Sequence, residues 1–266
     1  METFIIQDFQ FIAIMVALAA CSVFAITWFL EKSPLSNWFK NSEGIAVSFI
    51  AVPAFLFGLS ISTLSSSIWD SHVSANSSLV KESTATRTLT SIASTLPPLD
   101  GKSLNLATKN YVSTVLNKEW PAMKSENPIG KTVALAEFEN LNNVANTIAM
   151  QINQRSSIEG HLLSTIDILR HERLQRLSLA YDSTNFSRWP SVFVLSFLLM
   201  MTVGLLQLKS PRAMRISLIM GALCISSTML FLYLNISPYH GMNPVNPQSL
   251  EESLKLIPTA PLNTEK

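Results

Sequence analysis

Charged residues are scarce in this chain. Only 14% of its 266 residues are Asp, Glu, Lys or Arg, whereas about 25% is usual in soluble proteins. The formal net charge is +1, so there is no basic surplus to neutralise a phosphate backbone, and we expect no nucleic-acid partner. Cysteine is scarce too, because Cys21 and Cys224 are too few for a disulfide framework or a zinc site. These shortages argue against an ordinary cytosolic enzyme.

The motifs that carry common chemistry are also missing. The sequence contains no P-loop, no dinucleotide-binding glycine motif, no HExxH zinc motif and no nucleophile elbow. Its four histidines, His72, His161, His171 and His240, are scattered without a convincing metal-ligand spacing. We therefore predict that the protein is not an enzyme, and we expect no cofactor and no metal.

The missing charge is concentrated in four long uncharged stretches. They contain 22, 20, 20 and 19 residues and cover residues 9–30, 45–64, 189–208 and 216–234. Each is close to the roughly 20 apolar residues that a helix needs to cross a bilayer. Glu2 and Asp8 precede the first stretch without any Lys or Arg, which argues for an uncleaved span over a signal peptide. We predict four transmembrane helices and a lipid bilayer as their surroundings.

The spacing of these stretches predicts an all-α fold with two transmembrane hairpins. Between spans two and three lies a long insertion of ordinary charge density, in which apolar residues recur every three or four positions, as in helices. We expect one break between its helices at Pro97-Pro98 with Asp100-Gly101, and the next at Pro121 and Asn127-Pro128 with Gly130. The predicted parts are a first transmembrane hairpin (1–66), a helical extramembrane domain (67–188), a second hairpin (189–238) and a C-terminal tail (239–266).

Span two contains an unusual proline, Pro53, which we expect in the middle of the helix. A proline there frees a carbonyl group, that of Phe49, which at membrane depth is tolerable only against protein or water. Phe49, Pro53, Phe57 and Ser60 lie along one stripe of the predicted helix. Taken alone, the stripe is explained better by a kink packed inside a helix bundle than by a pore.

Several local motifs occur in an order that resembles the bestrophin-like family of bacterial membrane proteins, a domain of unknown function. The motifs are Val80-Lys81-Glu82-Ser83, Leu96-Pro97, Tyr111, Glu119-Trp120-Pro121-Ala122-Met123, Arg170 to Arg173 with Arg176, and Asn235 to Gly241. The last motif departs from the family, which has an acid where this chain has Asn235 and a proline earlier than Pro238. Without the family, Asn235, Pro238 and Gly241 are typical of a helix end.

The resemblance implies a multi-pass homo-oligomer in which span two lines a path for an inorganic anion. Phe49, Pro53, Phe57 and Ser60 would then be pore-lining residues, with the aromatic rings forming a hydrophobic constriction. The alternative is a membrane-anchored scaffold or sensor that conducts no ions. In that case Arg170, Arg173 and Arg176 would bind lipid headgroups or a protein partner.

The sequence alone gives conflicting indications of the membrane orientation. Lys32 and Lys40 in the first short loop, with Lys209, Arg212 and Arg215 in the second, favour short loops in the cytoplasm. The arginines that precede span three, and the resemblance to bestrophins, favour a cytoplasmic helical domain instead. We expect the second arrangement, in a bacterial inner (plasma) membrane.

Overall fold

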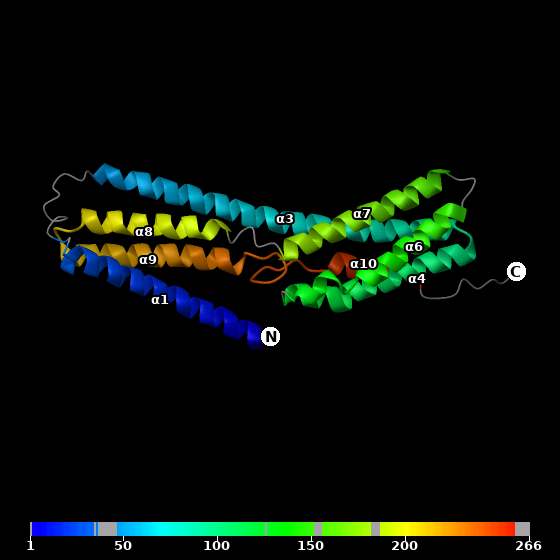
Figure 1. Ribbon diagram of the computed structural model, residues 1–266, viewed down its shortest axis with the longest axis horizontal. Helices are drawn as coiled ribbons and strands as arrows, with labels where there is room; N and C mark the ends of the chain where they lie inside the picture. Colours follow the sequence, from blue (N-terminus) through cyan, green and yellow to red (C-terminus); the bar gives the residue numbers. More distant parts are fainter. Residues whose placement is uncertain are drawn as a thin grey trace. The chain divides into compact units, whose positions relative to one another are not determined.

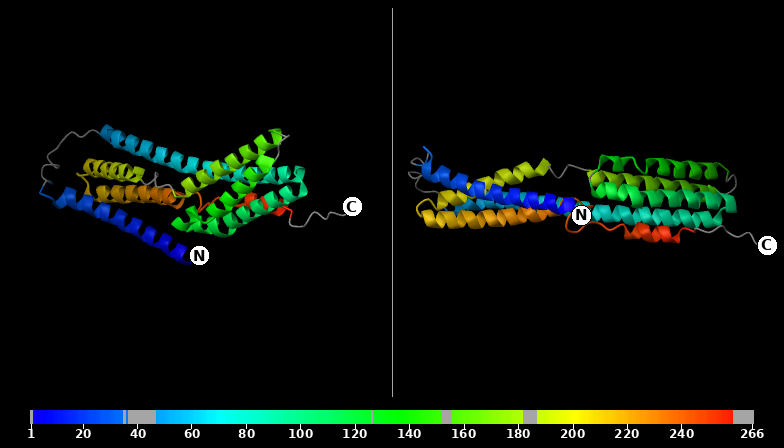
Figure 2. Two further views of the ribbon diagram at one scale, coloured as in Figure 1. Left: turned by 45° about the vertical axis from the view of Figure 1, so that its right-hand side comes forward. Right: turned by 90° about the horizontal axis from the view of Figure 1, so that it is seen from below.

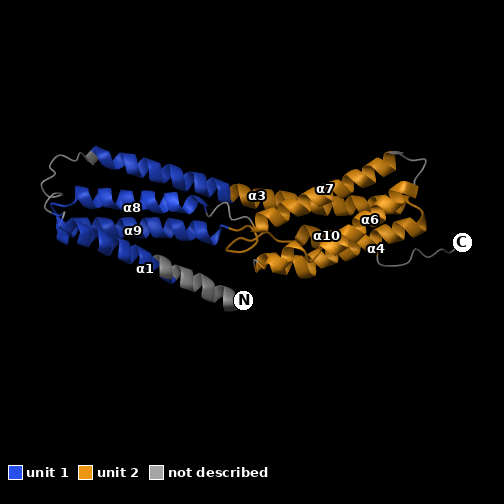
Figure 3. Ribbon diagram, viewed as in Figure 1, with its two compact units in different colours: residues 1–68, 183–236 blue, residues 69–182, 237–266 orange. Residues whose placement is uncertain are grey.

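The computed structural model of the chain describes residues 2–34, 36, 47–125, 127–151, 156–181 and 187–258. Within these ranges the chain forms helices, turns and no strand, which confirms the predicted all-α fold. It divides into two compact units (Figure 3). Unit 1 comprises residues 1–68 and 183–236, and unit 2 comprises residues 69–182 and 237–266.

Unit 1 consists of long apolar helices. Its helices are α1 (Glu2–Lys32), the first part of α3 (Ala51–Thr95), which follows the short 3₁₀ helix η1 (Val47–Ile50), and α8 (Trp189–Leu206) and α9 (Pro211–Leu234). The helices α1, α8 and α9 pack against one another (Figures 1 and 2). The described residues contain three helices long and apolar enough to cross a membrane, which are Ser48–Thr95, α8 and α9. The helix α1 covers the first predicted span, and the count of four spans stays a prediction.

Proline and a C-cap residue set the ends of the α8–α9 hairpin. Pro190 lies in the first turn of α8 and Pro211 begins α9, where a missing N–H costs no helical hydrogen bond. Asn235 is the C-cap of α9, and its side-chain amide donates a 2.9 Å hydrogen bond to the Phe231 carbonyl. Gly241 has a φ of 112°, a conformation that favours glycine. These positions confirm the predicted helix end.

Unit 2 is a helical bundle. Besides the second part of α3, it contains α4 (Pro98–Thr114), η2 (Val115–Glu119), α5 (Trp120–Lys124), η3 (Pro128–Lys131), α6 (Leu135–Gln151), α7 (Ser156–Tyr181) and α10 (Gln248–Leu256). The described part of the segment expected to be a tail, residues 239–258, belongs to this bundle, because Tyr239 and Leu250 are buried in its core. The Ser83 hydroxyl on α3 also donates a 2.6 Å hydrogen bond to the Ser249 carbonyl.

The break predicted at Pro121 and Asn127-Pro128 lies at the second of these positions and not at Pro121. The chain stays helical from Pro98 to Lys124, because η2 is a single π-helical turn in which the Trp120 N–H bonds to the Val115 carbonyl five residues earlier. Pro121 therefore occupies the start of α5, where its missing N–H is tolerated. Single π turns inside α-helices are frequent at functional sites.

Candidate functional site

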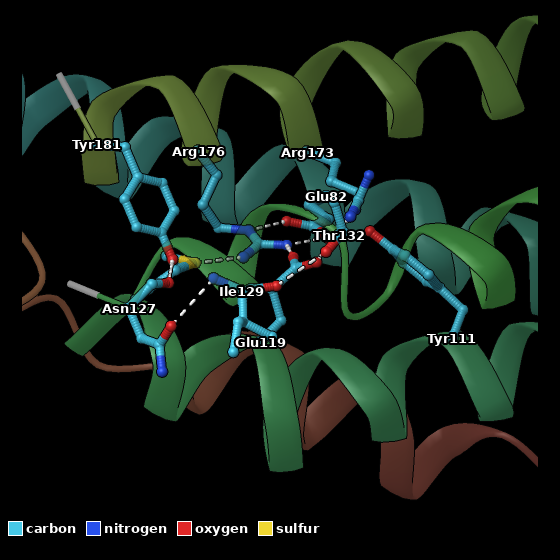
Figure 4. A network of polar contacts seen from close by, with 10 residues as sticks. Glu82, Tyr111, Glu119, Asn127, Ile129, Thr132, Arg173, Arg176 and Tyr181 are labelled. Atoms are coloured by element: carbon cyan, nitrogen blue, oxygen red, sulfur yellow. Dashed lines mark hydrogen bonds and ion pairs between the residues drawn. The ribbon is translucent and has the colours of Figure 1, made fainter. Parts of the chain in front are cut away.

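Four ionised side chains are buried together in unit 2 (Figure 4). Glu82 comes from α3, Glu119 is the last residue of η2, and Arg173 and Arg176 lie on α7. The exposed fraction is 0% for Glu82, Glu119 and Arg176 and 3% for Arg173. Because two carboxylates face two guanidinium groups, the cluster is electrically balanced. We call these four residues the charge network.

Arg176 joins both carboxylates. Its Nε lies 2.8 Å from Glu82 Oε2, and its Nη2 lies 2.7 Å from Glu119 Oε1 and 3.2 Å from Glu82 Oε1. The remaining nitrogen, Nη1, lies 3.0 Å from the Met123 sulfur. Arg173 Nη2 reaches the other Glu119 oxygen, Oε2, at 2.7 Å. Glu119 is therefore held by two arginines, one at each oxygen.

Local sequence explains how each charge reaches the core. On α7, Arg173 lies one turn after Leu169 and one turn before Leu177, so it shares the buried face of the helix with both leucines. On α3, Glu82 lies on the buried face that also contains Leu79 and Leu89. The π turn of η2 carries Glu119, which is itself buried, to the same place.

Tyr111 on α4 completes the contacts of Glu82. Its hydroxyl donates a 2.6 Å hydrogen bond to Glu82 Oε1. Burial, and then the adjacent Glu82 carboxylate, raise the pKa of Tyr111 well above its ordinary value. Burial alone would lower the pKa of Arg176, but the Glu82 and Glu119 carboxylates outweigh it and raise that pKa. At neutral pH the phenol therefore keeps its proton and the guanidinium keeps its charge.

Aromatic rings surround the network. The Trp120 ring lies 5.7 Å from Arg176 Cζ and packs edge-on against Tyr239, with 5.6 Å between ring centroids. The Phe138 ring lies 5.9 Å from Arg173 Cζ. Such contacts stabilise cations that have lost their water. All four carboxylate oxygens of the enclosed network have internal partners, although Arg173 Nε has none among the described residues. The network therefore suits fixing three helices to one another better than binding a substrate.

The predicted lipid- or partner-binding arginines fall into two groups. Arg170 is exposed, with its Nη1 3.3 Å from Asp167 Oδ1 and its Nη2 3.1 Å from Asn142 Oδ1. Arg173 and Arg176 point into the core and are occupied by the network. A lipid or partner site at Arg170 stays a prediction, whereas the buried pair offers no surface to a headgroup.

The predicted pore-lining residues differ in exposure. Phe49 is 56% exposed, Pro53 is buried, and Phe57 and Ser60 are half-buried. Phe57 packs against the cluster that Leu64 and Ile68 form with α8 and α9. Pro53 does not lie in the middle of the helix as expected: α3 begins at Ala51, so Pro53 lies in the first turn, where N–H groups have no helical partner. Pore lining by the four residues stays a prediction.

The motif residues of the middle region converge on the charge network, which their order in the chain did not indicate. Glu119, Trp120 and Met123 contact Arg176, and Pro121 follows the π turn that carries Glu119. Pro238 is buried, and its carbonyl accepts a 2.8 Å hydrogen bond from Val245 N. Sequence reasoning missed Glu82 as a partner of Arg176. The one local sign of the role of Glu82 is that a charged residue occupies a position on the apolar, buried face of its helix.

A family model described as Bestrophin-like domain matches residues 16–250, which is most of the chain and includes the whole charge network. No curated protein and no solved structure matches the chain.

Proposed function

The chain belongs to the bestrophin-like family, and from this premise we propose that it is an oligomeric membrane channel for small inorganic anions. It is an integral membrane protein whose apolar helices lie in the bilayer. In the proposal, the α3 helices of several copies surround the ion path. The observation that carries the proposal is the exposed face of α3.

Most of α3 in unit 1 is left uncovered by its own chain. Of its most apolar 18-residue stretch only 11% is buried, compared with 28% for α8 and 22% for α9. Exposed residues occupy most of the circumference of this stretch, and Val52, Phe55, Leu59, Ser62 and Ser66 lie along one face of it at helical spacing. We call this the open face of α3. A long helix with so little cover suits packing against other copies.

The open face changes character along its length. Val52 and Phe55 are apolar, and with the exposed Phe49 they would form a hydrophobic constriction that gates by dewetting. Ser62 and Ser66 add hydroxyl groups. Lipid chains offer a hydroxyl group no hydrogen-bond partner, whereas a neighbouring helix or a water-filled path does. Residues 45–64 contain no carboxylate that would favour cations, so hydroxyl donors would contact the permeating anion. We also propose that the helical unit lies in the bacterial cytoplasm.

Ion flux tests the proposal. The purified full chain, reconstituted into liposomes loaded with chloride, is expected to release chloride faster than empty vesicles and faster than it releases potassium. Phe49→Ala should raise the chloride flux, because it widens the constriction. Phe197→Ala, which truncates a similarly exposed ring on α8, should leave the flux unchanged. If neither the wild-type chain nor Phe49→Ala exceeds empty vesicles, a non-conducting scaffold or sensor is favoured.

A further inference from the structure

Unit 1 contains an open groove between α1 and α9 that the channel proposal does not use. Its volume is about 640 Å³, and its lining is apolar along most of its length and charged at one end. We propose that this groove binds a phospholipid, with an acyl chain along the apolar part and the phosphate at Lys32 and Arg215. This lipid site does not depend on whether α3 lines an ion path.

The apolar part has the dimensions of a chain-binding groove. Ala19 and Ala20 on α1 leave room between the helices, while larger side chains such as Val16, Phe24 and Leu223 form the walls. The volume lies within the roughly 300–1,000 Å³ that is usual for sites of small molecules. A helix from a second copy would need a width of about 10–12 Å along its whole length. A cylinder of that width exceeds about 640 Å³ within about two turns, so a flexible acyl chain fills the groove more completely than a helix would.

The charged end of the groove matches a phosphate group. Arg215 Nη2 lies 3.1 Å from Glu31 Oε2, so this ion pair connects α9 to α1 where the apolar lining stops. The Arg215 side chain is still 58% exposed, and the neighbouring Lys32 is exposed as well. Two cations against one carboxylate leave a net positive charge at this end.

The other residues at this end fit the position of a lipid headgroup. Trp28, which also lines the groove, is 51% exposed, and tryptophan is enriched at the membrane–water interface. Lys209 and Arg212, on the turn before α9 and in its first turn, are exposed too. Basic clusters next to membrane helices attract anionic lipids. An anionic headgroup such as that of phosphatidylglycerol is therefore expected to bind better than a zwitterionic one.

Native mass spectrometry of the full chain tests this proposal. The chain in mild detergent is incubated with phosphatidylglycerol or with phosphatidylcholine of the same acyl chains. Wild type should retain phosphatidylglycerol in preference to phosphatidylcholine. Ala20→Phe should reduce retention of both lipids at least about tenfold, because it fills the space for the chain. Lys32→Gln combined with Arg215→Gln should abolish the preference for phosphatidylglycerol.

Matched controls separate the groove from the rest of unit 1. Ala25→Phe adds the same ring at an exposed position of α1 outside the groove, and Arg188→Gln removes an exposed positive charge at the N-cap of α8, which does not line the groove. Both should retain lipid as wild type does. The proposal is overturned if Ala20→Phe retains lipid like Ala25→Phe, or if the double charge variant keeps the wild-type preference. It is also overturned if Ala20→Cys chains that carry Cys21→Ala and Cys224→Ala cross-link to each other, since a second copy then occupies the groove.

Discussion

Replacing Arg176 with methionine is expected to destabilise the helical unit by about 3–5 kcal/mol. The substitution removes the guanidinium that contacts both Glu82 and Glu119 and keeps an unbranched apolar side chain in place of the arginine stem. Glu82 then keeps only the Tyr111 hydroxyl as a polar partner in the network. A buried carboxylate without a balancing charge is strongly unfavourable. Thermal unfolding of the full chain in detergent, followed by circular dichroism, measures the effect.

A second substitution should restore most of the loss. Arg176→Met combined with Glu82→Gln removes one charge of each sign and leaves the Arg173–Glu119 pair, whose atoms are 2.7 Å apart, intact. Tyr111 can still donate its hydrogen bond, because the amide introduced by Glu82→Gln keeps one side-chain oxygen as an acceptor. Arg170→Met is the matched control, because the exposed Arg170–Asp167 pair is expected to contribute less than about 1 kcal/mol.

Two outcomes would contradict this account of the charge network. One is an Arg176→Met chain as stable as the Arg170→Met control. The other is a double variant no more stable than Arg176→Met alone, which would mean that Arg176 does not act by balancing Glu82. If the account holds, the network fixes α3 to α7 and η2 through Glu82, on the same helix whose earlier residues are proposed to line the ion path.

The second large effect is expected from a negative charge on the open face of α3. The starting chain has Cys21→Ala and Cys224→Ala, because both natural thiols are exposed. Ser62→Cys in this background, treated with a water-soluble anionic thiol reagent, should lower chloride flux at least about tenfold. Two unit charges about 4 Å apart repel by several kcal/mol at a protein surface, and about 1.4 kcal/mol already slows a rate tenfold. A cationic reagent of similar size should block far less.

Two other introduced cysteines, one on α9 and one on α3, show which helix surfaces are in contact with water. Ser227→Cys lies at an exposed position of α9, and with lipid around it the thiol should react slowly and leave the flux unchanged. Ser60→Cys tests the half-buried side of α3 that also contains Phe57. Block at Ser60→Cys but not at Ser62→Cys would assign the path to the stripe of Phe49, Pro53, Phe57 and Ser60. Equal block by both reagent charges would indicate steric obstruction and not an anion path.

Features that depend on local composition could be predicted from the sequence. Uncharged stretches coincide with α8, α9 and the first part of α3, because crossing a bilayer requires a continuous apolar run. The three- and four-residue periodicity likewise predicted the helices that became α6 and α7. Pro121 was misjudged, since no local pattern announces the π turn that accommodates it.

Features that depend on distant contacts could not be predicted in the same way. Glu82 and Arg176 are 94 residues apart, so only the packed bundle brings them together. A local signal did exist at Arg173, which continues the apolar series that ends with Leu169 before it and resumes with Leu177 after it. Helical spacing alone therefore argued that Arg173 is buried, although a basic run before a membrane span suggested a lipid-facing surface. The structure shows that the charge of Arg173 is balanced by Glu119 in the interior of the bundle and not by a lipid-facing surface.

The arrangement of copies in a lipid nanodisc, imaged by single-particle electron microscopy, tests the central claim most directly. The account predicts several copies around one axis, with the α3 helices innermost and the open face of Val52, Phe55, Leu59, Ser62 and Ser66 toward that axis. A monomer, a dimer without a central opening, or an oligomer whose α3 helices face lipid would contradict it.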